Sequence, residues 1–310
     1  MSDLRQRVPG HSLIEQLLRE WDLGNIHPGS QPGEIVIDDR ARGWYLGVHG
    51  ERWVARRLAT LGPEYTVLHS VPIGRGDSDI DHVVIGPAGV FTINSKYSPG
   101  KRVWSAGYGI YVGDFPEKHY IRNMQLEVRR AAARLSRASG LDIHPMGLIV
   151  FVDPASVTRK APAGDGTLDI RVIADAELLP TIGNRPVFTP EEVARIADAA
   201  SRPETWHDAP HESTIGSHIA QEFVALEEAV GVVGARAAAT RRTARVPRRA
   251  VRPPTNWMTR DPVKRNPPAR TRSHKFGSAL RRLLTLAIVL GAWYWSTQPA
   301  GQAFLSGLFK

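Results

Sequence analysis

Three side chains whose types could act together on a phosphate ester lie in one stretch, GDSDIDHVVIGPAGVFTINSK, residues 76–96. Asp81 begins one apolar strand pattern, and Asn94 and Lys96 end the next. Because side chains alternate across a strand, Asn94 and Lys96 should share one face while Ser95 points to the other. A turn at 86–89, with Pro87 at its second position, brings Asp81 beside them.

Hydrolysis of a phosphodiester needs a metal ion to activate water and to neutralise charge on the phosphate, so the protein must supply oxygen ligands. Asp81 is the carboxylate best placed for this task, and the backbone carbonyl of Ser95 is a second oxygen donor. Lys96 can orient the attacking water or stabilise the transition state as a point charge. The pattern therefore predicts metal-dependent phosphodiester hydrolysis at these strand ends.

The surrounding elements form the pattern of a compact α/β domain over residues 40–201 with a core at 41–152. Apolar residues at helical spacing predict helices at 41–61 and 120–138, and a capping box at 189–192 begins another to about 200. Apolar runs predict strands at 65–71, 80–85, 90–93, 146–152 and 170–174, and a hairpin at 102–104 and 109–112. The order of the core is α-β-β-β-α-β.

The motifs in residues 47–97 resemble the nuclease-related domain, NERD, of the PD-(D/E)xK restriction-endonuclease-like superfamily. The matching residues are Gly47 and Gly50-Glu51 on the first helix, then Ile80-Asp81-His82, Gly89-Val90-Phe91 and Ile93-Asn94-Ser95-Lys96. The resemblance covers most of 41 to about 152. It implies a restriction-endonuclease-like core, DNA as the substrate, and Mg²⁺ or Mn²⁺ as the cofactor, with Asp81 and Lys96 at the catalytic centre.

Asn94 departs from the family pattern, because that position usually holds Glu. An amide oxygen can still coordinate Mg²⁺ but adds no charge, so replacement carboxylates matter. Glu51 on the first helix is the first choice, as in several relatives, and Asp79 is the second because it lies two residues from Asp81. The other reading of Glu51 is an exposed position on an amphipathic helix.

Other polar and aromatic residues surround this predicted site. Gln125, near the family's helical glutamine, and Arg75, in the loop before Asp79, are predicted phosphate contacts. His82 points away from Asp81, which favours packing or an internal hydrogen bond over metal ligation. The hairpin aromatics could stack on nucleic-acid bases, but packing within the hairpin is the favoured interpretation. These aromatics are Trp104, Tyr108 and Tyr111.

Composition excludes several classes of function. The chain has no cysteine, which rules out disulfides, thiolate metal sites and cysteine nucleophiles. No nucleotide-binding glycine loop, HExxH or GxSxG element occurs, so NTPase, zinc protease and serine hydrolase readings lack support. The polar start, MSDLRQRVPG, does not have the pattern of a cleavable signal peptide.

The net charge of +9 is concentrated in one segment. Residues 236–282 hold fifteen Lys or Arg and one acidic side chain, and their Arg/Pro/Thr-rich composition predicts a disordered linker. Such a linker could bind DNA or anionic lipid. Residues 151–235 hold fourteen acidic and six basic side chains, which could recruit a protein partner.

Residues 283–310 form a hydrophobic segment that begins LLTLAIVLGAWYW and is uncharged until Lys310. Thirteen apolar residues are fewer than the roughly 17 to 25 that a spanning helix needs, but flanking residues and Arg281-Arg282 can extend the segment. We expect a single C-terminal membrane anchor, with the nuclease-like domain in the cytoplasm by the positive-inside rule. Otherwise the protein would be cytoplasmic.

The predicted organisation has five parts: an N-terminal accessory arm at 1–39, the NERD-like domain at 40–201, a helical extension at 202–235, the basic linker at 236–282 and the hydrophobic segment at 283–310. The favoured function is a membrane-tethered, metal-dependent endo- or exodeoxyribonuclease. One alternative is a catalytically impaired nucleic-acid-binding or scaffold module, because of Asn94. The other is a tail-anchored partner-binding protein. The sequence leaves catalysis itself and the oligomeric state open.

Overall fold

A computed structural model describes residues 3–29, 35–73, 78–183, 185–207 and 223. These residues belong to one compact unit, Met1–Val246. The predicted helix at 210–235, the linker at 236–282, the hydrophobic segment at 283–310 and Arg75 therefore lie outside the described residues, Phe223 excepted.

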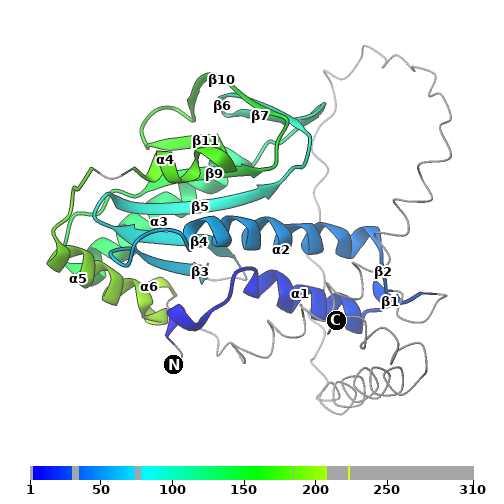
Figure 1. Cartoon of the computed structure of the whole chain (residues 1–310), viewed down its shortest axis with the longest axis horizontal. Coiled ribbons are helices and arrows are strands. Elements are labelled where there is room, and N and C mark those ends of the chain that lie inside the picture. The colour runs from blue at the N-terminus through cyan, green and yellow to red at the C-terminus, as the bar shows by residue number, and fades with distance from the viewer. Residues whose placement is uncertain (1–2, 30–34, 74–77, 184, 208–222, 224–310) are drawn as a thin grey trace, which may run out of the picture. The chain divides into compact units, whose positions relative to one another are not determined.

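A five-stranded mixed sheet forms the centre, in the order β11-β9-β5-β4-β3 (Figure 1). β3 (Thr66–Pro72), β4 (Asp79–Gly86) and β5 (Gly89–Tyr97) are antiparallel neighbours, whereas β9 (Met146–Val152) and β11 (Ile170–Ala174) run parallel to β5. The strands of this sheet match the predicted positions, and β5 is longer than predicted because it continues through Asn94 and Lys96. The α/β class is thus confirmed.

Two long helices cover the sheet on opposite faces (Figure 1). α2 (Asp39–Leu58) packs Val54 and Leu58 against one core cluster that includes Phe91. α3 (Tyr120–Ser139) contributes Ala131 and Leu135 to a second cluster with Val83 and Ile85 of β4. The order α2, β3, β4, β5, α3, β9 is the predicted α-β-β-β-α-β order, with three strands of a small sheet inserted between β5 and α3.

The small sheet has the order β10-β6-β7-β8. β6 (Arg102–Gly107) and β7 (Gly109–Val112) form the predicted hairpin, and β8 (Phe115–Pro116) extends it. β10 (Ser156–Ala163) pairs parallel with β6 and was not predicted, because SVTRKAPA contains proline and lacks an apolar alternation. Its strand conformation comes from pairing with β6 rather than from its own sequence.

Residues before α2 form a small layer on that helix. η1 (Leu4–Gln6) precedes α1 (His11–Asp22), which places Ile14 and Leu17 in one cluster with Val48 of α2. β1 (Ile26–Pro28) and β2 (Ile35–Ile37) pair with each other. The unit is completed by the elements that follow β11 in the chain: η2 (Asp175–Glu177), α4 (Leu178–Ile182), α5 (Pro190–Ser201) and α6 (Pro203–Trp206).

The close approach of α2 to the end of β5 depends on Gly50. A side-chain carbon at this position would lie 3.3 Å from the backbone nitrogen of Tyr97. Glycine therefore lets the helix pass directly over the strand end that follows Lys96. This contact also fixes the position of the next helical residue, Glu51, which is buried.

Candidate active site at the ends of β4 and β5

Asp81 of β4 is held in place by hydrogen bonds from β5. Its Oδ2 accepts hydrogen bonds from the backbone N–H of Ser95 at 2.6 Å and from Ser95 Oγ at 2.7 Å. The prediction that Ser95 points away from Asp81 is therefore wrong. Burial raises the pKa of Asp81, and the positive charge of Lys96 and the bonds from Ser95 oppose that rise.

A local irregularity in the strand pairing explains the placement of Asp81. The β3–β4 ladder pairs His69 with His82 and Val71 with Ile80, and Ser70 between them has φ +46°, in the left-handed region. Ile80 and Val83 enter the same core cluster although strict alternation would separate them. The simple alternation used for the prediction is thus interrupted beside Asp81.

Asn94 connects a cation to a carboxylate. Lys96 Nζ donates a hydrogen bond to Asn94 Oδ1, and Asn94 Nδ2 donates one to Oε1 of Glu127 on α3 at 3.2 Å. The Lys96 ammonium also lies 4.9 Å from the centre of the Tyr120 ring. Because a carboxylate has no N–H to donate, an ionised Glu at position 94 could not make both hydrogen bonds. The amide therefore fits these two neighbours in a way that the family's usual residue would not.

Glu127 is a candidate site residue that the sequence analysis missed. Its Oε2 is buried and has no hydrogen-bond partner. Burial raises the pKa of Glu127 to about 8, and the negative charge of Asp81 adds to this rise. A signal was available: Glu127 directly precedes the buried Val128 on α3, so an acidic side chain lies beside the face that the helix turns to the sheet.

Glu51 and Asp79 lie next to the N-terminal arm. Glu51 Oε2 accepts hydrogen bonds from the backbone N–H of Gly10 at 2.9 Å and from Ser70 Oγ at 3.3 Å. Asp79 Oδ2 is buried without a hydrogen-bond partner, and the positive charge of Arg7 acts on this carboxyl. Glu51 is only 3% exposed, so the exposed-stripe reading of this residue is wrong.

The electrostatics of these two carboxyls reflect crowding of like charges. Burial, followed by the charges of Asp81 and Asp79, raises the pKa of Glu51 well above its usual range. Burial and the charge of Asp81 raise the pKa of Asp79 to about 6. The four acidic side chains, Glu51, Asp79, Asp81 and Glu127, therefore influence one another in a partly desolvated region.

A known protein family matches the part of the chain that holds this site. The family model of the nuclease-related domain, NERD, matches residues 46–152. This segment is a nuclease-related domain. Each described candidate named above for catalysis or metal binding lies within the NERD segment, Glu127 included. Gly10, which bonds to Glu51, and Arg7, whose charge acts on Asp79, belong to the N-terminal arm outside this segment.

The other comparisons add little. Among solved structures, SfsA from Pyrococcus furiosus in complex with Ca²⁺ is 16% identical, with a match that covers 56% of this chain and 65% of that chain. Its TM-score of 0.20 is too low to indicate a shared fold. No curated protein matches the chain.

Gln125 of the NERD segment bonds within the protein. Its Nε2 lies 3.3 Å from Tyr108 OH and 3.4 Å from Asp165 Oδ1, and both oxygens accept hydrogen bonds from it. These contacts join α3 to the β6–β7 turn and to the turn after β10. The predicted contact of Gln125 with phosphate stays a prediction, as does that of Arg75.

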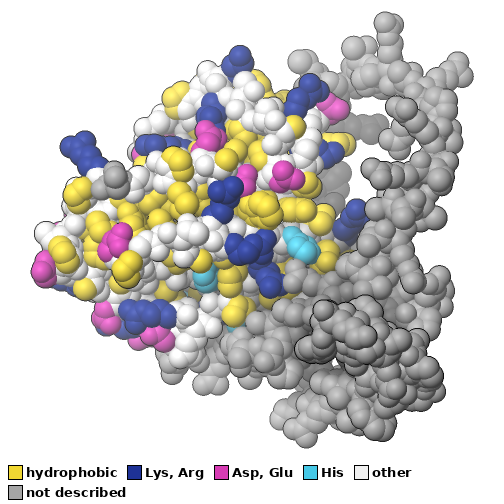
Figure 2. All heavy atoms as spheres, viewed as in Figure 1, with side chains coloured by type: hydrophobic (Ala, Val, Ile, Leu, Met, Phe, Trp, Pro, Cys, Tyr) yellow, Lys and Arg dark blue, Asp and Glu magenta, His cyan; other side chains and the backbone are white. Residues whose placement is uncertain are grey.

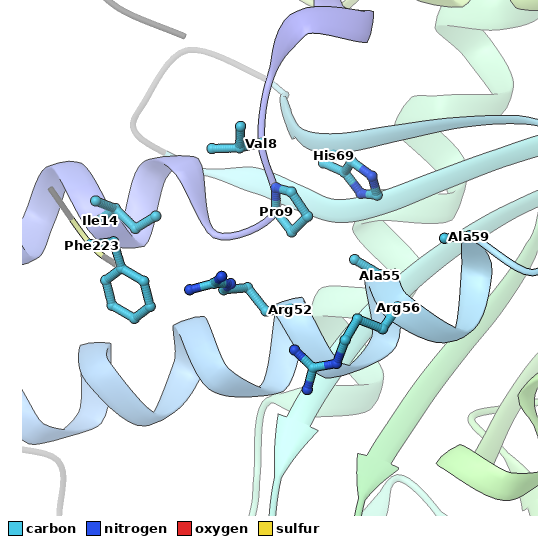
Figure 3. Close-up of a pocket in the computed structure, with 9 residues that line it drawn as sticks. All are labelled: Val8, Pro9, Ile14, Arg52, Ala55, Arg56, Ala59, His69 and Phe223. Atoms are coloured by element: carbon cyan, nitrogen blue, oxygen red, sulfur yellow. The ribbon is translucent and has the colours of Figure 1, made fainter. Parts of the chain in front are cut away.

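His82 of the NERD segment makes the predicted internal hydrogen bond. Its Nδ1 lies 2.9 Å from Nδ1 of His69 on β3. His69 in turn faces a cavity of about 430 Å³ beneath the N-terminal arm (Figure 3). The lining of this cavity, which includes Pro9, Arg52 and Arg56, contains none of Asp81, Asn94 and Lys96. This cavity is therefore separate from the candidate active site.

The residues of the NERD site fit a divalent cation in chemistry. Two buried carboxylate oxygens, Asp79 Oδ2 and Glu127 Oε2, have no partner, and crowded acidic groups raise each other's pKa. Carboxylate and amide oxygens are ligands that Mg²⁺ accepts. Within the described part of the chain, however, no three acidic or histidine side chains converge closely enough to hold a metal by themselves. A metal here would need Asn94, backbone oxygens or water as additional ligands.

Proposed function

We propose that the NERD domain hydrolyses phosphodiester bonds of DNA with the help of a divalent metal ion, Mg²⁺ or Mn²⁺. The observation that carries this proposal is the contact of Asn94 with both Lys96 and Glu127 beside Asp81, inside a segment that matches a nuclease-related family. We also propose that α2, β3, β4, β5, α3 and β9 form a restriction-endonuclease-like core, since their order agrees with it.

The carboxylates define where the cation would be held. Asp81 and Glu127 are the principal ligands in this proposal, with Asn94 and the Ser95 carbonyl as neutral oxygen donors. Asp79 stays an additional candidate. Glu51 is a weaker one in this arrangement, because its Oε2 bonds to Gly10 of the N-terminal arm and to Ser70, whereas Glu127 contacts Asn94 directly. When bound, the metal would lower the pKa of a water molecule and neutralise charge on the phosphate.

Lys96 has a separate role. Its ammonium is held by Asn94 on one side and by the ring of Tyr120 on the other. A fixed cation at this place can stabilise negative charge that develops on the phosphate oxygens in the transition state. Asn94 then acts mainly as a positioning residue, because its amide holds Lys96 and Glu127 at fixed places relative to each other.

A second candidate function is a nucleic-acid-binding module without catalysis. The observation that favours it is the absence, among the described residues, of three acidic or histidine side chains grouped for metal binding. In this reading Asn94 closes a polar network between β5 and α3, and Lys96 contacts phosphate without any cleavage. The domain would keep the family's fold and its affinity for DNA.

Incubation of the full chain with linear, circular and single-stranded DNA tests the proposal. With Mg²⁺ or Mn²⁺ we expect cleavage by the wild type and loss of cleavage in Asp81→Ala and in Lys96→Ala. Glu64→Gln, an exposed acidic position away from the site, should cleave like the wild type. If both site variants cleave normally, the assigned centre is wrong. Binding of DNA without cleavage under either metal would support the non-catalytic module.

Residues 283–310 carry a separate proposal. We propose that they anchor the chain in a membrane with the NERD domain on the cytoplasmic side, on the basis of their composition. Among the described residues, none of the helices has the length and hydropathy required to cross a bilayer. Extraction of membranes with carbonate tests the anchor: retention in the pellet supports it, and release into the supernatant contradicts it. The acidic region at 151–235 stays a candidate surface for a protein partner.

A further inference from the structure

The small sheet exposes a pair of aromatic side chains on neighbouring strands. Trp104 of β6 is paired with Tyr111 of β7, and their side chains are 38% and 44% exposed. Their ring centres are 5.7 Å apart at an interplanar angle of 71°. The edge of one ring therefore rests against the other, so the two aromatics keep each other in fixed orientations on the open side of the sheet.

Packing of the hairpin uses the opposite face. Val103 and Ile110, which alternate with the two aromatics, are each 1% exposed and belong to a core cluster with Ile121 of α3. The edge-to-face contact between Trp104 and Tyr111 is the packing within the hairpin that the sequence favours, but it leaves more than a third of each residue exposed. Since the hairpin is already anchored by its other side, the exposed aromatics are available for a ligand.

Cations lie beside this aromatic pair. Arg102 is two residues before Trp104 on β6, so alternation places it on the same side of the strand, and it is exposed. Lys101 directly precedes this strand, and Lys160 directly follows Arg159 of β10, which pairs with Ser105 of β6; both lysines are exposed. In the described part of the chain these three side chains form no ion pair. Lys and Arg side chains among hydrophobic ones are visible over the small sheet in Figure 2.

Tyr108 links the turn of this hairpin to α3. Tyr108, in the turn between β6 and β7, is 41% exposed, and the Arg122 guanidinium lies 5.9 Å from the centre of its ring. Tyr108 accepts a hydrogen bond from Gln125, which lies on the same helix as Glu127. On the chain, the segment 98–101 alone separates the strand that carries Lys96 from β6. The small sheet that carries the aromatic pair is thus connected directly to the strand that carries Lys96.

We propose that the face of Trp104 and Tyr111 binds single-stranded DNA by stacking on unpaired bases, with Arg102, Lys101 and Lys160 at the phosphates. Aromatic rings stack on any base, but bases inside a duplex are already stacked on each other and are not accessible to these side chains. Cations beside the rings provide the sequence-independent attraction to the backbone. The inference rests on the proposed function in taking DNA as the ligand, and it deepens that function by selecting the unpaired form.

The test uses the full chain in a mild detergent with a chelator, so that binding is measured without cleavage. The probes are an oligodeoxythymidine with one internal 2-aminopurine and a duplex hairpin that contains the same base. We expect the single-stranded probe to be quenched on binding, and Trp104→Ala to remove the quenching and weaken binding roughly tenfold. Trp104→Phe should keep most of both effects, and Val187→Ala, an exposed apolar position outside the small sheet, should keep all of them.

The linker at 236–282 is present in every variant, so a difference between them reports the aromatic face alone. Unchanged quenching and affinity in Trp104→Ala would overturn the proposal, as would equal losses for the single-stranded and duplex probes. A wild type that dimerises through this face, with Trp104→Ala monomeric and DNA binding unaltered, would also overturn it. Because no cleavage is measured, stacking can be confirmed even if the nuclease proposal fails, and the reverse also holds.

Discussion

Asn94 of β5 donates a hydrogen bond from Nδ2 to Oε1 of Glu127 on α3, at 3.2 Å. This contact joins the position where the family usually carries Glu to a carboxylate from another element. A carboxyl group that the strand lacks is thus present on the facing helix. Asn94 and Glu127 together offer an amide oxygen and a carboxylate near Asp81, whereas the sequence alone showed only a missing ligand.

Removal of the Glu127 charge should weaken metal binding. In the wild type we expect Mn²⁺ to raise the melting temperature, because a ligand present at about 100 times its Kd stabilises the folded state by about 2.7 kcal/mol. Glu127→Gln keeps the size of the side chain and should abolish most of that rise. Thermal unfolding with and without Mn²⁺ measures the effect, with Glu64→Gln as the control. An undiminished rise in Glu127→Gln would show that Glu127 does not bind the metal.

Arg7 should stabilise the fold through the acidic groups of the site. Its guanidinium charge acts on Asp79, which has an unpartnered buried oxygen. We expect Arg7→Ala to lower the free energy of unfolding by about 1–3 kcal/mol, since it leaves buried polar groups uncompensated. The matched control is Arg5→Ala, because Arg5 and its partner Asp3 are exposed, and such pairs contribute about 0–1 kcal/mol. Urea unfolding of both variants measures the difference, and equal losses would contradict the role of Arg7.

The buried histidine pair should make stability fall in acid. Burial lowers the pKa of His69 to about 4, and burial together with the charge of His69 lowers that of His82 well below its usual range. In the unfolded chain both titrate near pH 6.5. The unfolded state therefore binds protons that the folded state does not as pH falls from about 6.5 toward 4, and stability is lost through that window.

The size of this pH effect can be measured by urea unfolding across the same window. Each histidine should contribute a slope of up to about 1.4 kcal/mol per pH unit. His69→Gln should lower the slope of the unfolding free energy with pH by the contribution of one histidine. His144→Gln should not change it, because His144 is highly exposed. If His69→Gln leaves the slope as in the wild type, the pair is not neutral in the folded protein.

Docking of α2 on the sheet should depend on Leu58. This side chain is 1% exposed in the cluster that includes Phe91 and Ile93. Leu58→Ala should lower the free energy of unfolding by about 2–5 kcal/mol, because it removes buried apolar surface and leaves a cavity. Leu126→Ala on α3 is the comparison, since Leu126 is 49% exposed and its truncation should cost about 0.5 kcal/mol or less. A small loss in Leu58→Ala would show that α2 is not held by this cluster.

Much of the fold could be predicted because local patterns and the final packing agree. The run Met146–Val152 is apolar throughout, and it is the buried central strand β9 with these bounds. Thr189 begins α5 with its capping box, as the sequence indicates. β10 could not be predicted, because its strand conformation depends on a neighbour that is distant in sequence. The burial of Trp206 in α6 likewise depends on tertiary packing.

The candidate site was predicted only in part, and the reason is geometric. Strand alternation correctly predicted that the side chains of Asn94 and Lys96 lie on the same face, because the two share a hydrogen bond. It failed for Ser95, because the pairing is irregular at Ser70, next to Asp81. Glu127 is separated from Asn94 along the chain by β6, β7 and β8, so no spacing rule connects the two. Only the packing of α3 on the central sheet brings them together.

An exchange of the two side chains tests most directly whether Asn94 and Glu127 act together in cleavage. The measurement is the rate of Mg²⁺-dependent DNA cleavage by the wild type, by Glu127→Gln, and by the double variant Asn94→Glu with Glu127→Gln. The double variant moves the carboxylate to β5 and keeps one amide and one carboxylate in contact. We expect cleavage by the wild type, its loss in Glu127→Gln and its recovery in the double variant. Cleavage by Glu127→Gln at the wild-type rate, or no cleavage by any of the three, would contradict this expectation.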